Sequence, residues 1–244
     1  MNSRRLIFLF IFSISLILSE RSFSQHILGA VSAGINLSQV DGDEVYGYKK
    51  VGFNGGPSVI IPFGKNKKWS VTLELLFSQL GSRQKSVYSP TDSIVKKDAT
   101  RFYDGYRLSL NYVQIPVMVH FTDKRIIKGG IGFQYGQLVG VSEYEDHNDY
   151  QGFIRIDSTT LKGPYSLADL QVLADVAFRV YLGLWFNVRY SYSMLSIRHR
   201  EFENPFYHNT WWRKQYNNVI SLRLVYIFND ILPEKNKRSK EYTD

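Results

Sequence analysis

Alternation of apolar and polar residues with a period of two constrains this chain more than any other feature. In the segment 183–192, Leu184 and Phe186 share one face with further apolar residues, whereas Asn187 and Arg189 share the other. This pattern predicts β-strands that have one apolar face. Eight segments show it with varying regularity: 27–37, 51–63, 69–78, 106–121, 126–139, 168–180, 183–192 and 218–228.

The connections between these segments alternate between short and long. The short connections are 63–69, 121–126 and 180–183, and the long polar ones are 38–50, 79–105, 140–167 and 193–217. This rhythm is typical of outer-membrane barrels, which have short periplasmic turns and long outer loops. We therefore predict an all-β fold, an eight-stranded antiparallel up-and-down transmembrane β-barrel. A soluble β-sandwich, whose strands also alternate, is the alternative.

The segment 106–121 changes phase. Leu108, Leu110 and Tyr112 occupy even positions, whereas the apolar residues from Val113 to Phe121 occupy odd ones. An extra residue in a strand shifts its side chains to the opposite face. The sequence therefore predicts a β-bulge near Tyr112.

The N-terminus resembles an export signal. Arg4 and Arg5 precede an apolar run from Leu6 to Leu18, which is too short to span a bilayer. We predict a signal peptide over 1–24 that is cleaved after export through the inner membrane, although an uncleaved anchor helix is the alternative. The barrel is then expected over 25–228 and a basic periplasmic tail over 229–244.

Composition supports a place in the outer membrane. Phe, Trp and Tyr make up 15% of the chain, and aromatic residues gather at the two interfaces of membrane barrels. Without the signal, 27 Lys and Arg face 21 Asp and Glu, a net charge of about +6. An exported basic chain is expected to meet lipid phosphate or partner proteins, not nucleic acid. The sequence has 0 Cys, which excludes a thiolate nucleophile and a lipoprotein anchor.

The polar faces of the predicted strands converge on the barrel lumen. Because charged groups in a narrow interior must be paired, we expect a structural charge network there, and Gln114 and His120 should also point inward. A proton or ion path is the alternative. The predicted network consists of Glu74, Asp175, Arg179, Arg189 and Arg223.

The outer loops offer two weaker candidates for chemistry. The acidic run from Glu143 to Asp149 could bind Ca²⁺ but lacks the ligand spacing of a calcium loop, so a solvated loop is expected. His199 lies near Ser193 and Ser196, as a lipid-acylating or deacylating barrel would require, yet no nucleophile motif surrounds them. We predict no catalytic residue, no metal and no cofactor.

The loop 193–217 is unusually aromatic. Its aromatic side chains could form the outer girdle of the barrel, or an exposed tip that binds a partner. The candidates for partner binding are Phe202, Phe206, Tyr207, Trp211 and Trp212.

Three stretches resemble the PorT family of outer-membrane barrels. They are Gly34–Asp43 followed by Gly52–Gly56, then Leu73–Gln79 followed by Gly81, and Leu110–Val117, in which Gln114 stands where a Glu is expected. The resemblance implies a part in the type IX secretion system of Bacteroidetes, which exports proteases and adhesins, through partner proteins of that system. Because an eight-stranded barrel is filled by side chains, the role would be scaffolding or assembly. A lipid A-modifying enzyme and a general structural or adhesion barrel are the alternatives.

Overall fold

A computed structural model describes residues 27–43, 45–64, 66–84, 105–124, 126–149, 152–159, 164–203 and 210–228. The predicted signal peptide and periplasmic tail lie outside these residues, and the described part contains strands and no helix. No helix there is long and apolar enough to cross a membrane. The strands are β1 (Leu28–Asp41), β2 (Lys50–Phe63), β3 (Trp69–Glu74), β4 (Leu76–Gln84), β5 (Tyr106–Asp123), β6 (Ile127–Asp149), β7 (Gly152–Thr159), β8 (Ala168–Tyr181), β9 (Leu184–Ser193), β10 (Arg198–Glu203) and β11 (Thr210–Ile227).

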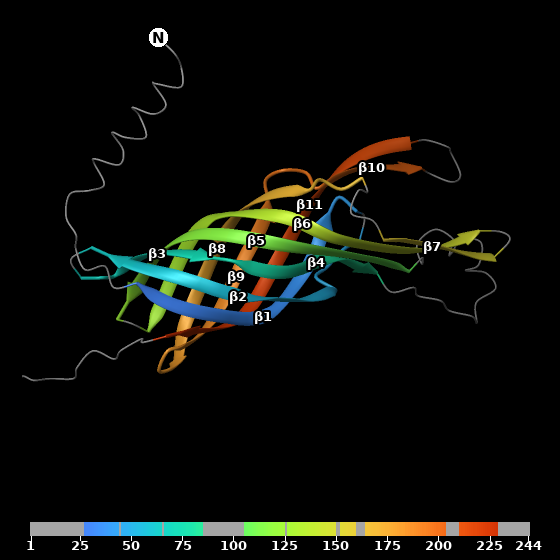
Figure 1. Ribbon diagram of the computed structural model, residues 1–244. Coiled ribbons are helices and arrows are strands. Elements are labelled where there is room, and N and C mark those ends of the chain that lie inside the picture. Colours follow the sequence, from blue (N-terminus) through green and yellow to red (C-terminus); the bar gives the residue numbers. More distant parts are fainter. Residues whose placement is uncertain are drawn as a thin grey trace, which may run out of the picture.

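The strands close into an antiparallel ring (Figure 1). The first strand pairs with the last along its length, from Ala30 opposite Ile227 to Asp41 opposite Tyr216. Because β3 and β4 occupy one place in the wall, between β2 and β5, the ring has eight positions. The predicted eight-stranded up-and-down barrel is confirmed.

The break between β3 and β4 lies between two prolines. The register places Pro57 of β2 opposite Leu75, and Pro116 of β5 opposite Glu74. Proline cannot donate a backbone hydrogen bond to a neighbouring strand, so the ladder is interrupted there. The Leu75 amide still donates to the Pro57 carbonyl at 3.0 Å, and the inward and outward alternation continues through the break.

Short turns lie at one end of the barrel and long connections at the other, as the lengths of the connections predicted. Tight turns with positive φ at Gly64, Lys67, Lys124 and Gly183 join strands at one end, where β1 begins and β11 ends (Figure 1). At the other end, several expected loops continue as strands. β6 runs on to pair with β7, and β10 pairs with the first part of β11. These extensions are polar because they leave the lipid, which is why alternation of apolar residues did not reveal them.

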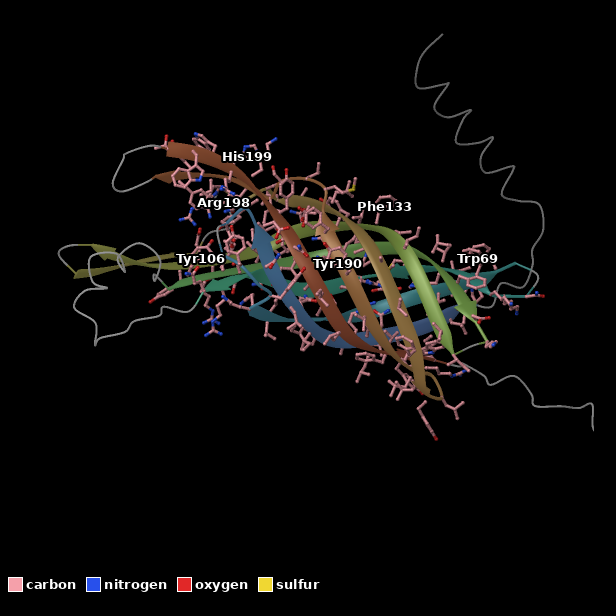
Figure 2. All side chains as sticks on the ribbon, turned by 180° about the vertical axis from the view of Figure 1, so that it is seen from behind. Trp69, Tyr106, Phe133, Tyr190, Arg198 and His199 are labelled. Atoms are coloured by element: carbon pink, nitrogen blue, oxygen red, sulfur yellow. The ribbon has the colours of Figure 1, made fainter. Side chains whose placement is uncertain are left out.

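The outward face of the wall is an apolar belt. Its side chains include Val31, Leu73, Val117, Phe133 and Leu224, all at least 44% exposed in the isolated chain. Aromatic residues gather at its rims. Trp69 lies near the short turns (Figure 2), with its ring 5.0 Å from that of Phe121, and the Tyr192 and Tyr216 rings stack at 6.1 Å towards the other end. Exposed apolar surface of this extent is suited to lipid, not water.

The register does shift beside Tyr112, where a β-bulge was predicted, but the predicted change of phase within 106–121 is wrong. The even residues of β5, including Leu108, Tyr112 and Gln114, face inward throughout. The irregularity lies in the partner, because Asn111 pairs with Gly140 and Tyr112 with Leu138, which leaves Val139 as the extra residue of β6. The pattern changed because the inward face is apolar near the extracellular end and polar further down.

The interior consists of three layers. An apolar layer near the extracellular end contains Leu80, Leu108, Leu110, Tyr112 and Ile197. A second, smaller apolar layer near the short turns is built around Ile60, Ala177, Trp185 and Ile227. Buried polar and charged side chains fill the level between them.

Candidate functional site

The middle layer holds a cluster of charged side chains contributed by strands from across the wall. Glu74 is the last residue of β3, and Asp175, Arg189 and Arg223 lie on β8, β9 and β11. Each of these side chains is at most 6% exposed. We call these four residues the lumen charge cluster, and its two carboxylates balance its two guanidinium groups.

Arg189 connects both carboxylates. Its Nη1 and Nη2 donate to Glu74 Oε2 and Oε1 at 3.1 and 2.7 Å, and its Nε and Nη2 donate to Asp175 Oδ2 at 3.2 and 2.9 Å. Planar, two-pronged contacts of this kind are the strongest hydrogen bonds that Arg makes to carboxylates. The cluster therefore links β3, β8 and β9 across the lumen.

Arg223, on the strand next to β9, completes the cluster. Its Nη1 donates to Glu74 Oε2 at 2.8 Å, and its Nε and Nη2 donate to the Asn187 side-chain oxygen at 2.9 and 2.7 Å. Gly34 of β1 gives this arginine its space, because a Cβ there would lie 2.7 Å from Arg223 Cα.

His120 extends the cluster towards the short turns. Its Nε2 lies 3.0 Å from Asp175 Oδ1, and its Nδ1 lies 3.0 Å from the Thr72 hydroxyl. Inward placement of His120 was predicted, but its contact with Asp175 depends on register and was not. Gly130 lies opposite, where a Cβ would come within 2.3 Å of the imidazole ring.

Arg179 occupies a different position from the other predicted members of the network. It lies near the end of β8, where its guanidinium lies 5.7 Å from the centre of the Trp185 ring. This places it against the lower apolar layer, to which Trp185 belongs. Four of the five predicted residues thus form the lumen charge cluster.

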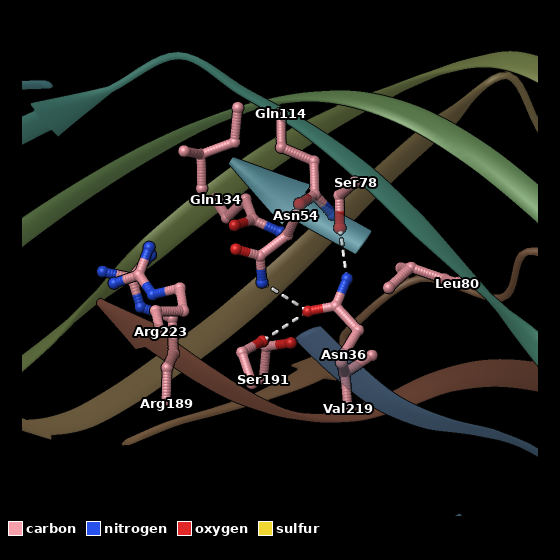
Figure 3. Close-up of a pocket in the computed structure, with 12 residues that line it drawn as sticks. Asn36, Asn54, Ser78, Leu80, Gln114, Gln134, Arg189, Ser191, Val219 and Arg223 are labelled. Carbon is pink, nitrogen blue, oxygen red and sulfur yellow. Dashed lines mark hydrogen bonds between the residues drawn. The ribbon is translucent and has the colours of Figure 1, made fainter. Parts of the chain in front are cut away.

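A network of uncharged polar groups lies above the cluster, centred on Asn36 (Figure 3). Asn36 Oδ1 accepts hydrogen bonds from Asn54 at 2.5 Å and from Ser221 at 2.8 Å, and its Nδ2 donates to Ser78 at 2.8 Å and to the Gln79 carbonyl at 3.2 Å. A cavity of about 10 Å³ beside this network is close to the space that one water molecule requires. Gln114 lines the same cavity.

The stretches that resemble a known family meet in this network. Asn36 and Ser38 belong to the first stretch, and Ser38 donates to the Gly81 carbonyl at 2.9 Å. Gly52 must be glycine because the Gln79 carbonyl oxygen would lie 2.1 Å from a Cβ there. These residues therefore specify how β4 packs against β1 and β2.

A second charged cluster, the mouth cluster, lies at the extracellular end. Glu143 accepts hydrogen bonds from Arg198 Nη1 at 2.7 Å, Tyr165 at 2.9 Å and Tyr106 at 3.0 Å, and Arg200 Nη1 lies 3.8 Å away. We expected Glu143 in a solvated acidic loop, and this is wrong, because it is 9% exposed. The side chains of 145–149, which include the other acidic residues of this run, lie outside the described residues.

The mouth cluster lies outside the membrane. At a rise of about 3.3 Å per residue and a tilt of about 40°, Glu143 is about 40 Å above Ile127, beyond an apolar band about 25 Å tall. Burial alone would raise the pKa of Glu143, but the hydrogen bond and positive charge of Arg198 outweigh burial and lower it. The carboxylate is therefore ionised at neutral pH and attaches β10 to β6.

The sequence matches a known family of membrane proteins over most of its length. Residues 22–198 fit the outer membrane protein beta-barrel domain. The chain belongs to this family. Its members form barrels of the outer membrane, which agrees with the ring and the apolar belt and confirms the predicted location.

Several solved outer membrane proteins resemble this barrel. The attachment invasion locus protein Ail of Yersinia pestis has 15% identity and a TM-score of 0.42, covering 82% of this chain and 98% of its own. Neisserial surface protein A has 11% identity and a TM-score of 0.41, covering 82% and 95%. A major outer membrane protein of Thermus thermophilus has 11% identity and a TM-score of 0.42, covering 83% and 100%. No curated protein sequence matches the chain significantly.

The serines near His199 in this outer membrane barrel lie in different surroundings. Ser193 is fully buried, and its hydroxyl donates to Asp169 at 2.9 Å and accepts from the Asn217 amide at 3.0 Å. Ser196 lies outside, with its hydroxyl 2.9 Å from His199 Nε2. Only Ser196 is therefore within reach of the histidine. Within the described ranges, no group of three His, Cys, Asp or Glu could hold a metal ion.

The aromatic residues of the last outer segment lie on a hairpin that projects beyond the barrel. The Phe202 and Trp211 rings stack at 6.0 Å, with the Arg200 guanidinium 5.0 Å from the Phe202 ring. This face of the hairpin joins the mouth cluster (Figure 2). Trp212 points to the other face and is 67% exposed. The remaining candidates, Phe206 and Tyr207, lie outside the described residues.

Proposed function

We propose that this outer membrane barrel is a non-enzymatic component of the type IX secretion system, related to PorT, which acts by scaffolding or assembly and not as the pore. The observation that carries the proposal is the filled interior. Apolar side chains occupy both ends of the lumen, and the lumen charge cluster occupies its middle. A barrel with this interior has no room for a protein cargo, so its contribution to export must come from its surface.

Opening the lumen would be costly. Separating Arg189 from Glu74 and Asp175 would leave charges buried without partners, and the loss of one partner of a buried ion pair costs about 3–5 kcal/mol. The cluster joins non-neighbouring strands, so it also holds the wall in a fixed shape. Rigidity of this kind suits a protein that presents binding surfaces to others.

The projecting hairpin of β10 and β11 is the surface best placed for a partner. Exposed tryptophan is enriched at the centres of protein interfaces, and Trp212 stands on the face of the hairpin that points away from the mouth cluster. On the opposite face, Arg198 and Arg200 attach the hairpin to Glu143. The hairpin is therefore fixed to the barrel and carries an exposed aromatic side chain outside the membrane.

Deletion of the gene and complementation test the proposal. Without the protein, unprocessed cargo of the secretion system should accumulate inside the outer membrane while lipid A remains unaltered. Complementation with the wild-type chain should restore export, and complementation with Trp212→Ser should restore it less than the control Tyr46→Ser, which also removes an exposed aromatic ring. Normal cargo export in the deletion strain would contradict the secretion role and leave the barrel assignment intact.

The hydrogen bond between Ser196 and His199 favours a second candidate, an enzyme that modifies lipid A. Histidine within 2.9 Å of an exposed serine hydroxyl is the pairing through which a general base activates a nucleophile. This function predicts that deletion changes the number of acyl chains on lipid A in mass spectra, and that Ser196→Ala and His199→Ala each reproduce the change. Unaltered lipid A in all three strains would exclude it.

A further inference from the structure

Three basic side chains meet above the apolar belt, two of them on the outer face of the barrel. Arg83 of β4 lies directly opposite Arg107 of β5, and both are exposed. Opposite residues of neighbouring strands have Cβ atoms about 5 Å apart, where two like charges destabilise the sheet. Lys50 of β2 lies beneath them: it belongs to the inward-facing side of its strand and is 8% exposed, but its Nζ donates to the Ser109 hydroxyl at 2.6 Å, next to Arg107 on the same face of β5.

The positive charges of this cluster are not compensated within the described residues. None of the ion pairs found there joins a carboxylate to Lys50, Arg83 or Arg107. The pKa of Lys50 is lowered, first by burial and then by the positive charges of Arg107 and Arg83, which agrees with close approach of the three groups. An anion would relieve this repulsion.

The height of the cluster indicates where the anion comes from. Along the outward face of β5, apolar side chains extend from Phe121 to Val113, and polar residues follow from Asn111 through Ser109 to Arg107. With a rise of about 3.3 Å and a tilt of about 40°, Ser109 lies about 30 Å above Phe121, just beyond an apolar band about 25 Å tall. This is the level of lipid headgroups in the outer leaflet.

An apolar surface adjoins the cluster. Val51 and Phe53, on the outward-facing side of β2, are 58% and 49% exposed, and Phe77 of β4 is 40% exposed. A molecule that carries a phosphate above acyl chains would contact both surfaces at once, whereas a free anion would use only the upper one.

We propose that Arg83 and Arg107, with the Ser109 hydroxyl and the positive charge of Lys50 beneath it, bind the phosphate of a phosphorylated glycolipid of the outer leaflet, whose acyl chains lie against Val51, Phe53 and Phe77. Two guanidinium groups provide paired donors for phosphate oxygens, and the ammonium of Lys50 adds a third positive charge. The site would attach the barrel to particular lipids of its own leaflet.

Native mass spectrometry of the purified full-length barrel in detergent tests this site with three probes: bisphosphorylated lipid A, fully dephosphorylated lipid A and inorganic pyrophosphate. We expect lipid A to bind at least tenfold more tightly than its dephosphorylated form. The double variant Arg83→Gln, Arg107→Gln should lose at least tenfold in affinity for lipid A. A double variant at the exposed turn residues Lys68 and Lys124, each changed to Gln, removes the same charge at the opposite rim and should bind like the wild type.

Each contrary result would overturn the assignment. Equal binding of the two forms of lipid A would mean that only apolar contact is involved. Equal loss of affinity in both double variants would assign binding to overall charge, and unchanged affinity in Arg83→Gln, Arg107→Gln would exclude the cluster. Pyrophosphate that binds as tightly as lipid A would make this a free-anion site, not a lipid site. Because the substituted side chains are exposed, every variant should fold, and heat-modifiable migration on gels verifies this.

Discussion

Arg189 and Glu74 form a two-pronged ion pair across the barrel lumen, although 115 positions separate them in the chain. Arg189 lies on β9 and Glu74 at the end of β3, so neither strand neighbours the other in the wall. Backbone ladders connect only adjacent strands. The side chains of the lumen charge cluster therefore add connections through the interior that the wall does not provide.

Replacing Glu74 with Leu should destabilise the barrel by about 3–5 kcal/mol, because Arg189 and Arg223 would remain buried with too few acceptors. Equilibrium unfolding of the purified variant in detergent and urea measures this loss. Asp123→Asn, which removes an exposed carboxylate at a short turn, serves as the control and should change stability by less than about 0.5 kcal/mol. Equal stability of Glu74→Leu and the wild type would mean that the pair does not hold the strands.

Gly34→Ala should also be destabilising, by about 1–3 kcal/mol, because overpacking forces the backbone to move. A Cβ at this position would lie 2.2 Å from the Leu222 carbonyl oxygen and 2.7 Å from Arg223 Cα, both on β11. Gly129→Ala is the matched control within a strand, since the nearest atom to its Cβ would be 3.9 Å away. Heat modifiability and urea midpoints of the two variants should differ. Similar midpoints would show that β1 and β11 can separate at little cost.

The alternation of residues was sufficient to predict the ring, since every strand of a small membrane barrel has one face in lipid. It failed where inward residues are also apolar. Leu108 and Leu110 pack in the upper layer of the interior, yet in sequence they look like lipid-facing residues, so the pattern suggested a bulge in the wrong strand. β7 and β10 lie within the segments that were predicted as long outer loops. They were not predicted as strands because they pair outside the lipid and need no apolar face.

For the candidate site, the sequence predicted which residues point inward but not which of them contact one another. Alternation placed Glu74, Asp175, Arg189 and Arg223 in the lumen, but the pairing of each depends on register and shear, which one sequence does not reveal. Arg179 has the same phase as Asp175 and was therefore predicted in the same cluster, whereas its height places it beside Trp185. The stretches that resemble PorT pack β4 onto β1 and β2, and so support the barrel family more directly than a role in secretion.

Asp43 should make the stability of the extracellular end depend on pH. It lies in the connection after β1, where burial raises its pKa from 3.8 to about 6; its Oδ1 accepts a hydrogen bond from the Val45 amide at 2.9 Å. Because the folded state binds the proton more tightly than the unfolded state, this contribution to stability is complete below about pH 4 and is lost as the pH rises through about 6. Asp43→Asn should abolish this dependence and stabilise the barrel at pH 7 by about 3 kcal/mol. Unfolding measured between pH 4 and pH 7 tests this, and identical slopes in the variant and the wild type would contradict it.

The mouth cluster should respond to pH in the opposite direction, and locally. The pKa of Glu143 is lowered, so its contribution is present above the unfolded value of 4.5 and is lost as the pH falls through the lower folded value. Arg198→Gln removes the positive charge that lowers this pKa and should therefore loosen the attachment of β10 at neutral pH. Hydrogen exchange reports this at the Ile197 and Ser166 amides, which donate at 2.8 Å to the Gln215 carbonyl and at 2.7 Å to the Ile197 carbonyl. Their protection should fall at least tenfold, while amides of β9 in the middle of the wall, such as Val188, keep theirs.

Arg213→Gln, on the same hairpin face but outside the contacts with Glu143, is the control. A uniform loss of protection across the barrel in Arg198→Gln would show instead that the mouth cluster supports the whole fold and is not a local attachment of the hairpin.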